Sequence, residues 1–449
     1  MTAVRRTLAA LGAGLVAQRL CQLGALLLLA RTLGREATGM HAQGVALGGL
    51  IAVAGNAGLR NAVARALARA PESAGLWLAA TVRARLLRTA ALLVPAAAAA
   101  ACCCASPWFW CASAAAALPA AFDLKHIGDV AARTRSEVAV ETGSSVLFLA
   151  LVAAWLRAGG TDLTVLAGIH LACRTVYALG AWRAMARLPR AGAAPRAREL
   201  LRESRATGRA QLAGDLGVAA DVCVVGWLAG DAAAGLYAVA LRLAGAAGMP
   251  TAQLARLFFA HQLHAAVRGD AARTTRVALR TTALVLLPML AGGCVAAAPL
   301  CALFGEQFAA AAPALRWLLA AGRDRAYGRA LWWQASAYLL LLGALAPTSG
   351  STGSAFAGAA AQTCFLAAAL RGLDRGVLQK PRWLVGPLAV ALLTGAATAA
   401  AAAVDAGPAL PRELGTGALA FAAGLYAVEL RRRWRRLGAG LAQASGFRS

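Results

Sequence analysis

Long apolar stretches, separated by short segments rich in arginine, follow one another along almost the whole chain. Each stretch holds about 20 mostly apolar residues, which is the length that a helix needs to cross the ~30 Å hydrocarbon core of a bilayer. The pattern predicts an all-α polytopic membrane protein with about fourteen transmembrane helices. The expected helices cover residues 8–30, 38–59, 86–105, 107–122, 138–156, 163–182, 210–229, 234–253, 277–298, 308–322, 331–347, 353–370, 383–404 and 414–430.

The overall composition agrees with this pattern. Hydrophobic residues make up 60% of the 449 residues and charged residues only 14%, and the mean hydropathy is +0.62. A soluble globular protein carries about 25% charged residues. The sequence therefore leaves no room for a sizeable soluble domain.

The formal charge of +26 would suggest a nucleic-acid partner in a soluble chain. Here, however, 37 of the 45 lysines and arginines fall in segments on one side of the expected membrane, including the tail "RRRWRR". Only Arg31, Arg35, Arg157 and Arg412 lie on the other side. By the positive-inside rule this asymmetry puts both termini in the cytoplasm. The charge is thus explained by topology, and we expect no nucleic-acid partner.

A short segment occurs twice at an offset of 196 residues. Aligning residues 33–49 with 229–245 superimposes Gly34 on Gly230 and Gly39 on Gly235. The offset spans six expected helices, and an even number of crossings preserves orientation, so the halves are expected to be parallel repeats. We interpret Gly39 and Gly235 as positions of close helix packing or turning.

This repeat predicts two six-helix bundles followed by two appended helices. The expected units are an amino-terminal bundle over 1–190, a basic cytoplasmic linker over 191–209, a second bundle over 210–382, helices 13 and 14 within 383–436, and a cytoplasmic tail over 437–449.

Metal and cofactor chemistry finds little support in the sequence. The ten cysteines lie mainly inside expected helices, and none has the spacing of metal ligands. His261 and His264 have no carboxylate or cysteine nearby to complete a site. We expect no metal, no cofactor and no catalytic residues.

Four segments carry a resemblance to a known family. They read "ARTLGREATGMHAQGVALGGL" with "NAGLRNAVAR" after it, "AADVCVVGWLAGDAAAGLYAVALRL", "LFGEQFAAAAPALRWL" and "GSTGSAFAGAAAQ". In order and spacing they resemble the polysaccharide-type (Wzx-like) oligosaccharide flippases of the multidrug/oligosaccharidyl-lipid/polysaccharide (MOP) exporter superfamily.

This resemblance implies a MATE-like fold of two bundles around a central cavity, in the cytoplasmic (inner) membrane of a bacterium. It also implies transport, without a chemical step, of a lipid-linked oligosaccharide, carried on a polyprenyl diphosphate, from the inner to the outer leaflet. Coupling to H⁺ or Na⁺ and cooperation with polysaccharide assembly proteins would follow.

One departure concerns the tenth helix. Only about 15 residues are left for it, which span roughly 22 Å at 1.5 Å per residue. Either the helix continues back into "LFGEQF", or the crossing is incomplete and the second half is irregular.

Four arginines remain inside expected helices once those near the cytoplasmic helix ends are assigned to the loops: Arg19, Arg174, Arg242 and Arg316. An arginine in the middle of the bilayer costs about 2.5–3.5 kcal/mol on insertion scales, so four facing lipid would cost roughly 10 kcal/mol. We therefore expect these side chains to face protein or a water-filled cavity.

Their polar neighbours suggest two readings. Gln18 and Gln22 flank Arg19, and His170 lies one turn before Arg174. In the functional reading Arg19, Gln18, Gln22, Arg174, His170 and Arg242 form a cationic cavity for phosphate, with Asp221 and Glu141 as ion-coupling or counter-ion groups. In the structural reading Arg242 pairs with Asp221, and Arg174 with Glu141, to hold helices together.

Three other functions are alternatives. A cation-coupled multidrug (MATE-type) exporter would want acidic residues in the first two helices, which contain none. A membrane glycosyltransferase or polymerase would need acid or base groups on substantial outer loops, whereas the outer acids here are few and scattered. A scaffold or non-transporting relative is the remaining alternative.

Overall fold

The structure is a computed structural model of the chain. It describes residues 2–59, 71–104, 106–123, 134–185, 197–248 and 296–321, with scattered single positions besides. Every element within these ranges is a helix, and four of those helices are long and apolar enough to cross a membrane. This confirms the all-α, multi-pass membrane fold. The helices predicted between 331 and 430 lie outside the described ranges.

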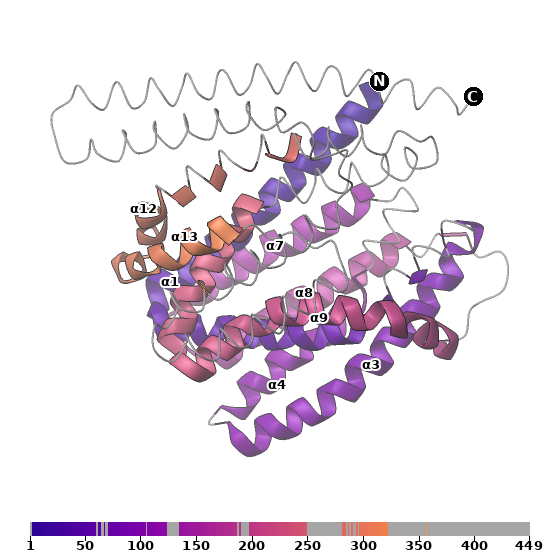
Figure 1. Cartoon of the computed structure of the whole chain (residues 1–449), viewed down its shortest axis with the longest axis horizontal. Coiled ribbons are helices and arrows are strands. Elements are labelled where there is room, and N and C mark those ends of the chain that lie inside the picture. The colour runs from indigo at the N-terminus through magenta and orange to yellow at the C-terminus, as the bar shows by residue number, and fades with distance from the viewer. Residues whose placement is uncertain are drawn as a thin grey trace, which may run out of the picture.

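The first two expected helices form a single element, α1 (Thr2–Asn56), which is kinked at Gly34. The backbone there has φ 80° and ψ −178°, a conformation that residues with a Cβ rarely adopt. Two helical segments diverge from this point at one end of the molecule (Figure 1). The predicted hinge is therefore a single glycine, and the helices continue almost up to it on both sides.

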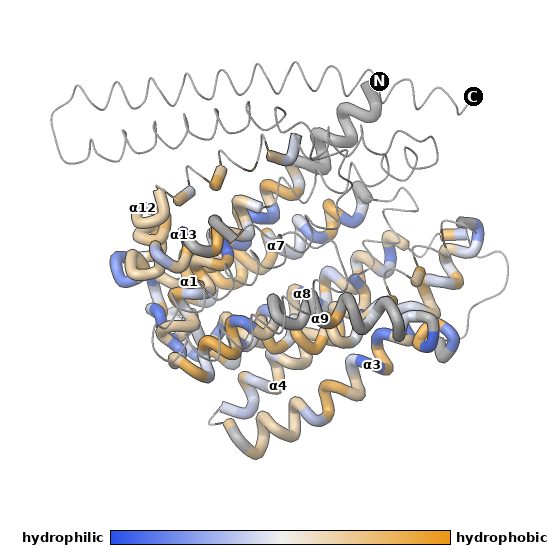
Figure 2. Tube along the Cα trace, in the orientation of Figure 1, coloured by the Kyte–Doolittle hydropathy of each residue, from blue (hydrophilic) through white to orange (hydrophobic). Residues whose placement is uncertain are grey.

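The next helices of the first half follow the apolar pattern. After the short 3₁₀ helix η1 (Pro71–Ser73), the structure has α3 (Ala74–Cys103), α4 (Pro107–Ala115), α5 (Ala117–Ala120), α7 (Thr134–Arg157) and α8 (Leu163–Met185). Among them α3 begins twelve residues before the predicted helix, and the added residues include Arg83 and Arg85. Figure 2 shows hydrophilic positions on α3 near its label and mostly hydrophobic ones toward the end that leads to α4.

The second half repeats the kinked pair. Helix α9 (Ala197–Ala229) is followed by Gly230, with φ 84°, and by a helix over residues 231–248. Gly34 and Gly230, which the offset of 196 aligns, thus share a positive φ, in the region that favours glycine. This equivalence supports the repeat on conformational grounds. Residues 197–209 of the predicted basic linker form the first turns of α9.

The segment around the ninth and tenth helices is irregular. Helix α12 (Ala297–Ala302) ends in a turn that leads to Gly305, with φ 121°. A 3₁₀ helix, η2 (Glu306–Ala311), then runs directly into α13 (Ala312–Ala321). The tenth helix is therefore extended backwards only as a 3₁₀ helix from Glu306, and its far end lies outside the described residues.

Packing joins the halves through α1, which lies against α7 of its own half and against α9 of the other. One apolar core joins α9, the helix over 231–248, α12 and α13 around Tyr237 and Leu315. A second core, around Leu78 and Met185, joins the start of α3, the end of α8 and the start of α9.

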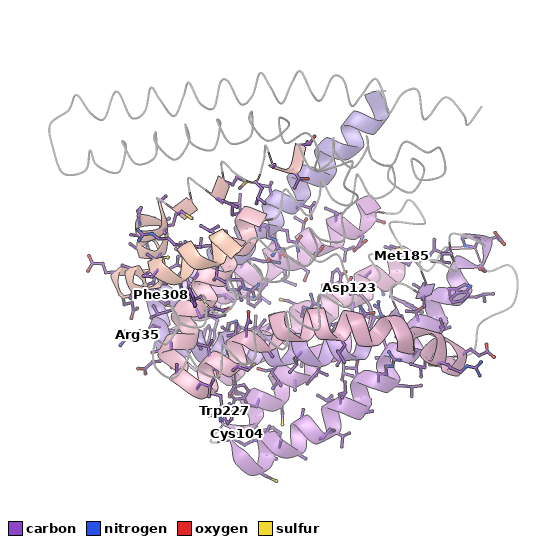
Figure 3. All side chains as sticks on the ribbon, viewed as in Figure 1. Arg35, Cys104, Asp123, Met185, Trp227 and Phe308 are labelled. Atoms are coloured by element: carbon purple, nitrogen blue, oxygen red, sulfur yellow. The ribbon has the colours of Figure 1, made fainter. Side chains whose placement is uncertain are left out.

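Arg35, Cys104 and Trp227 lie toward one end of the molecule, and Asp123 and Met185 toward the other (Figure 3). The topology prediction likewise puts these two groups on opposite sides of the membrane.

Candidate functional site

Within the described ranges, the two halves touch closely where Gly39 of α1 meets Gly235. A Cβ added to Gly39 would lie 2.7 Å from the amide nitrogen of Gly235, and one added to Gly235 would lie 3.2 Å from the amide nitrogen of Gly39. The same two Cβ positions press still closer on the carbonyl oxygens of Asp231 and Arg35, respectively. Arg35 and Asp231 are also 196 residues apart, so the two sides of the contact are equivalent. We call the contact between Gly39 and Gly235 the outer crossing. The prediction of close-packed glycines is confirmed, and the two glycines pack against each other.

Polar contacts reinforce the outer crossing. The amide of Gln43 donates to a carboxylate oxygen of Asp231 at 2.6 Å. Nearby, the Nε of Arg31 donates to the carbonyl oxygen of Leu303 at 2.8 Å. Both bonds connect α1 to the second half. The halves are therefore closed against each other at the end of the molecule that carries the kink of α1.

Arg19, the first predicted site residue, lies on α1 about fifteen residues before the kink, or roughly 22 Å along the helix axis. Its Nη1 donates to Oε1 of Gln22 at 2.9 Å. Gln18 is buried beside it, with 5% of its surface exposed. The polar stripe expected from the sequence is thus formed within one helix.

Arg242, on the helix over 231–248, belongs to the second half and lies near the polar residues of α1. Its charge interacts with those of Arg19 and Asp221. Asp221 is buried, and its carboxylate accepts hydrogen bonds from the Tyr237 hydroxyl at 3.1 Å and from the Val222 amide at 2.7 Å. The Arg242 side chain is itself exposed. An exposed arginine that interacts with charged groups on α1 and α9 fits an inward-facing side chain better than one in lipid.

Two histidines of the first half lie near these charged groups. The rings of His41 on α1 and His170 on α8 are edge to face, with centroids 6.3 Å apart. Arg242 interacts electrostatically with both, and Arg174 with His170. His41 was missed by the sequence reasoning, although its position in the repeated segment, as an ionisable residue within an apolar span, could have drawn attention.

We refer to Arg19, His41, His170, Arg174, Asp221 and Arg242 together as the interior cluster. Its members come from both segments of α1, from α8, from α9 and from the helix over 231–248. Among these six residues the three guanidinium groups outnumber the one carboxylate, that of Asp221.

Glu141 lies beside this cluster. It interacts, as Arg174 does, with Tyr177 on α8. The guanidinium carbon of Arg174 lies 5.4 Å from the centre of the Tyr177 ring, in range for a cation–π interaction. No hydrogen-bond partner reaches the buried Tyr177 hydroxyl within the described part of the chain. Glu141 and Arg174 therefore share Tyr177 as a neighbour. The direct pairing of Arg174 with Glu141 stays a prediction.

Arg316 has a different environment. Its Nε donates to the carbonyl oxygen of Cys294 at 3.1 Å, and this bond lies at an exposed position. The contact caps a backbone carbonyl of the neighbouring segment. Among the four arginines predicted to lie inside the membrane, Arg316 thus has a local structural partner.

Comparison with known proteins agrees with this fold. Residues 128–313 match the family model described as "Polysaccharide biosynthesis protein". No curated protein matches the sequence.

Two solved structures are similar over most of the chain. One is described as "Lipid II flippase MurJ, inward closed conformation", with a TM-score of 0.69, 11% identity, and coverage of 94% of this chain and 99% of the other. The second is an inward-facing multidrug resistance MATE family transporter of the MOP superfamily, with a TM-score of 0.56, 15% identity, and coverage of 79% and 94%. The chain therefore shares the fold of these two transporters, as the sequence predicted, and its residues 128–313 resemble polysaccharide biosynthesis proteins.

Proposed function

We propose that the protein is a flippase that moves a lipid-diphosphate-linked oligosaccharide from the inner to the outer leaflet of the cytoplasmic membrane. Transport proceeds by alternating access and includes no chemical step. The family match to polysaccharide biosynthesis proteins and the flippase-like fold support the general class. The charge of the interior cluster supports the diphosphate.

The observation that carries the proposal is that Arg242 of the second half lies within electrostatic range of Arg19 and of His170, which Arg174 also neighbours. Arginine presents a planar fork of donors that matches phosphate oxygens in pairs, and a guanidinium sheds its hydration more readily than an ammonium. Two such forks, one from each half, suit the two phosphates of a diphosphate. Without an anion, the like charges of Arg19 and Arg242 repel each other, so binding of the head group relieves that repulsion.

Because both halves contribute arginines to the site, binding of the ligand is coupled to the relative position of the halves. A ligand shifts a conformational equilibrium only if it binds one state better than the other. An anion held between Arg19 of the first half and Arg242 of the second is contacted best when the halves are close together. We propose that the diphosphate favours this closed arrangement and that its departure permits the halves to separate.

Binding and transport can be tested with one set of variants. The purified protein in nanodiscs is titrated with a short-chain polyprenyl diphosphate sugar, and transport is followed in proteoliposomes by exposure of the sugar to an impermeant glycosidase. Arg242→Gln should weaken binding at least tenfold, since a charge-assisted pair contributes about 1.5–3 kcal/mol. Arg183→Gln, which removes an exposed arginine from the end of α8, is the matched control.

The MATE-like fold makes a drug exporter the competing candidate. A cationic dye should fail to bind or to compete with the diphosphate sugar, because the interior cluster is cationic. Binding of the dye with no binding of the diphosphate sugar would overturn the proposal. Equal affinity of the wild-type protein for diphosphate and uncharged lipid would do so as well.

A further inference from the structure

A second close crossing joins the halves at the end opposite to the outer crossing. Just after α1, Gly58 has φ 74°, and a Cβ on it would lie 2.6 Å from the amide nitrogen of Gly208 in α9. A Cβ on Gly208 would lie 2.9 Å from the carbonyl oxygen of Ala57. Because neither glycine carries a side chain, the two backbones touch directly. We call this contact the inner crossing.

Arg88 of α3 holds the inner crossing from the side. Its Nη1 donates to the carbonyl oxygen of Ala57 at 2.8 Å, and its Nη2 donates to the hydroxyl of Ser204 at 2.9 Å. A weaker bond from Nη2 reaches the carbonyl oxygen of Leu201 at 3.4 Å. Ser204 is completely buried. One guanidinium therefore connects α3, the end of α1 and α9.

The inner and outer crossings lie on either side of the interior cluster. From Gly39 to Gly58 the chain is nineteen residues long, which is about 28 Å in a helix and close to the ~30 Å thickness of the hydrocarbon core. One stretch of chain thus contacts the second half near both faces of the membrane. Arg242 follows the Gly230 kink by twelve residues, or about 18 Å, which places it between the two depths.

We propose that the inner crossing is a cytoplasmic gate and that Arg88 is its latch. Closure brings the backbones of Gly58 and Gly208 together, and the Arg88 bonds to Ala57 and Ser204 hold them there. Opening requires Arg88 to release at least one of these partners. This inference rests on the proposed function only for the identity of the molecule that passes, not for the gate itself.

The test measures access to the interior cluster without any lipid substrate. In a background with the ten native cysteines replaced, Gln22→Cys reports access to Arg19, with which Gln22 is hydrogen bonded. The labelling rate by a charged, membrane-impermeant thiol reagent is measured from the cytoplasmic side. Arg88→Ala should raise this rate about tenfold, because it removes hydrogen bonds from a charged donor. Arg88→Lys should raise it less.

Arg83→Ala is the matched control, since Arg83 is an exposed arginine on the same helix; its labelling rate should equal that of the parent protein. If Arg88→Ala does not fold, Ser204→Ala removes one of the latch bonds and should give a smaller increase. Folded Arg88→Ala or Ser204→Ala protein that labels at the control rate would overturn the proposal. Failure to bind a polyprenyl diphosphate would count against the proposed function alone, since labelling involves no lipid.

Discussion

The outer crossing makes a sharp prediction for the substitution Gly39→Ala. A Cβ at this position would lie 2.7 Å from the amide nitrogen of Gly235 and 2.8 Å from the carbonyl carbon of Asp231. Ordinary contacts between non-bonded heavy atoms are about 3.5–4.0 Å. The two helices would therefore have to separate by more than about 1 Å, because the carbonyl oxygen of Asp231 lies closer still. Both neighbouring groups are backbone, so neither can turn aside as a flexible side chain would.

The expected cost follows from two opposing effects. Overpacking costs about 1–3 kcal/mol, and stretching the 2.6 Å bond between Gln43 and Asp231 adds about 1 kcal/mol. In the other direction, alanine is better than glycine inside a helix by up to about 1 kcal/mol. The net loss at Gly39 is about 1–3 kcal/mol. Gly49 lies on the same helical segment, and a Cβ added there would meet no neighbouring group within 4 Å, so Gly49→Ala should be neutral or stabilising.

The assay compares apparent Tm values of the two variants in detergent. One heating rate is used throughout, because the apparent Tm of a protein that unfolds irreversibly depends on the scan rate. Gly39→Ala should unfold at a lower temperature than Gly49→Ala and should lose transport. Gly235→Ala should behave like Gly39→Ala, and the double variant should cost less than the sum, because helices already separated by one methyl group accommodate the other. If Gly39→Ala is as stable and as active as Gly49→Ala, the crossing is not close packed.

Three further predictions concern topology, the cluster and its support. A cysteine at Asp162 should be labelled from outside the cell, and one at Glu199 only after permeabilisation; the reverse pattern would invert the topology. Arg19→Lys should lower transport partly and Arg19→Ala almost completely, with normal amounts of folded protein, whereas unchanged binding per folded molecule for Arg19→Ala would remove Arg19 from the site. Tyr237→Phe should lower stability by about 1–3 kcal/mol, and its effect should largely disappear in an Asp221→Ala background, as a double-mutant cycle on the Tm would report.

The apolar pattern and the repeat were sufficient to predict much of this fold. Helix positions follow from hydropathy, because a span of about 20 apolar residues is stable in a bilayer only as a helix. The equivalence of Gly34 and Gly230 also follows from the sequence, since a left-handed backbone conformation favours glycine wherever the chain needs it. Arg19, Arg174 and Arg242 were recognisable because a guanidinium inside an apolar span is costly unless it faces protein or water.

The tertiary structure decided which of these residues meet. Hydropathy gives no information on how a helix is rotated against its neighbours, so the contacts of Gly39 with Gly235 and of Gly58 with Gly208 could not be read from spacing. For the same reason His41, a single polar residue in an apolar helix, joined the interior cluster only in three dimensions. The sequence likewise did not determine the break between α12 and η2, because a short apolar segment permits several backbone paths. Which faces of the helices pack together depends on contacts between residues far apart in the chain, and these are a property of the folded molecule.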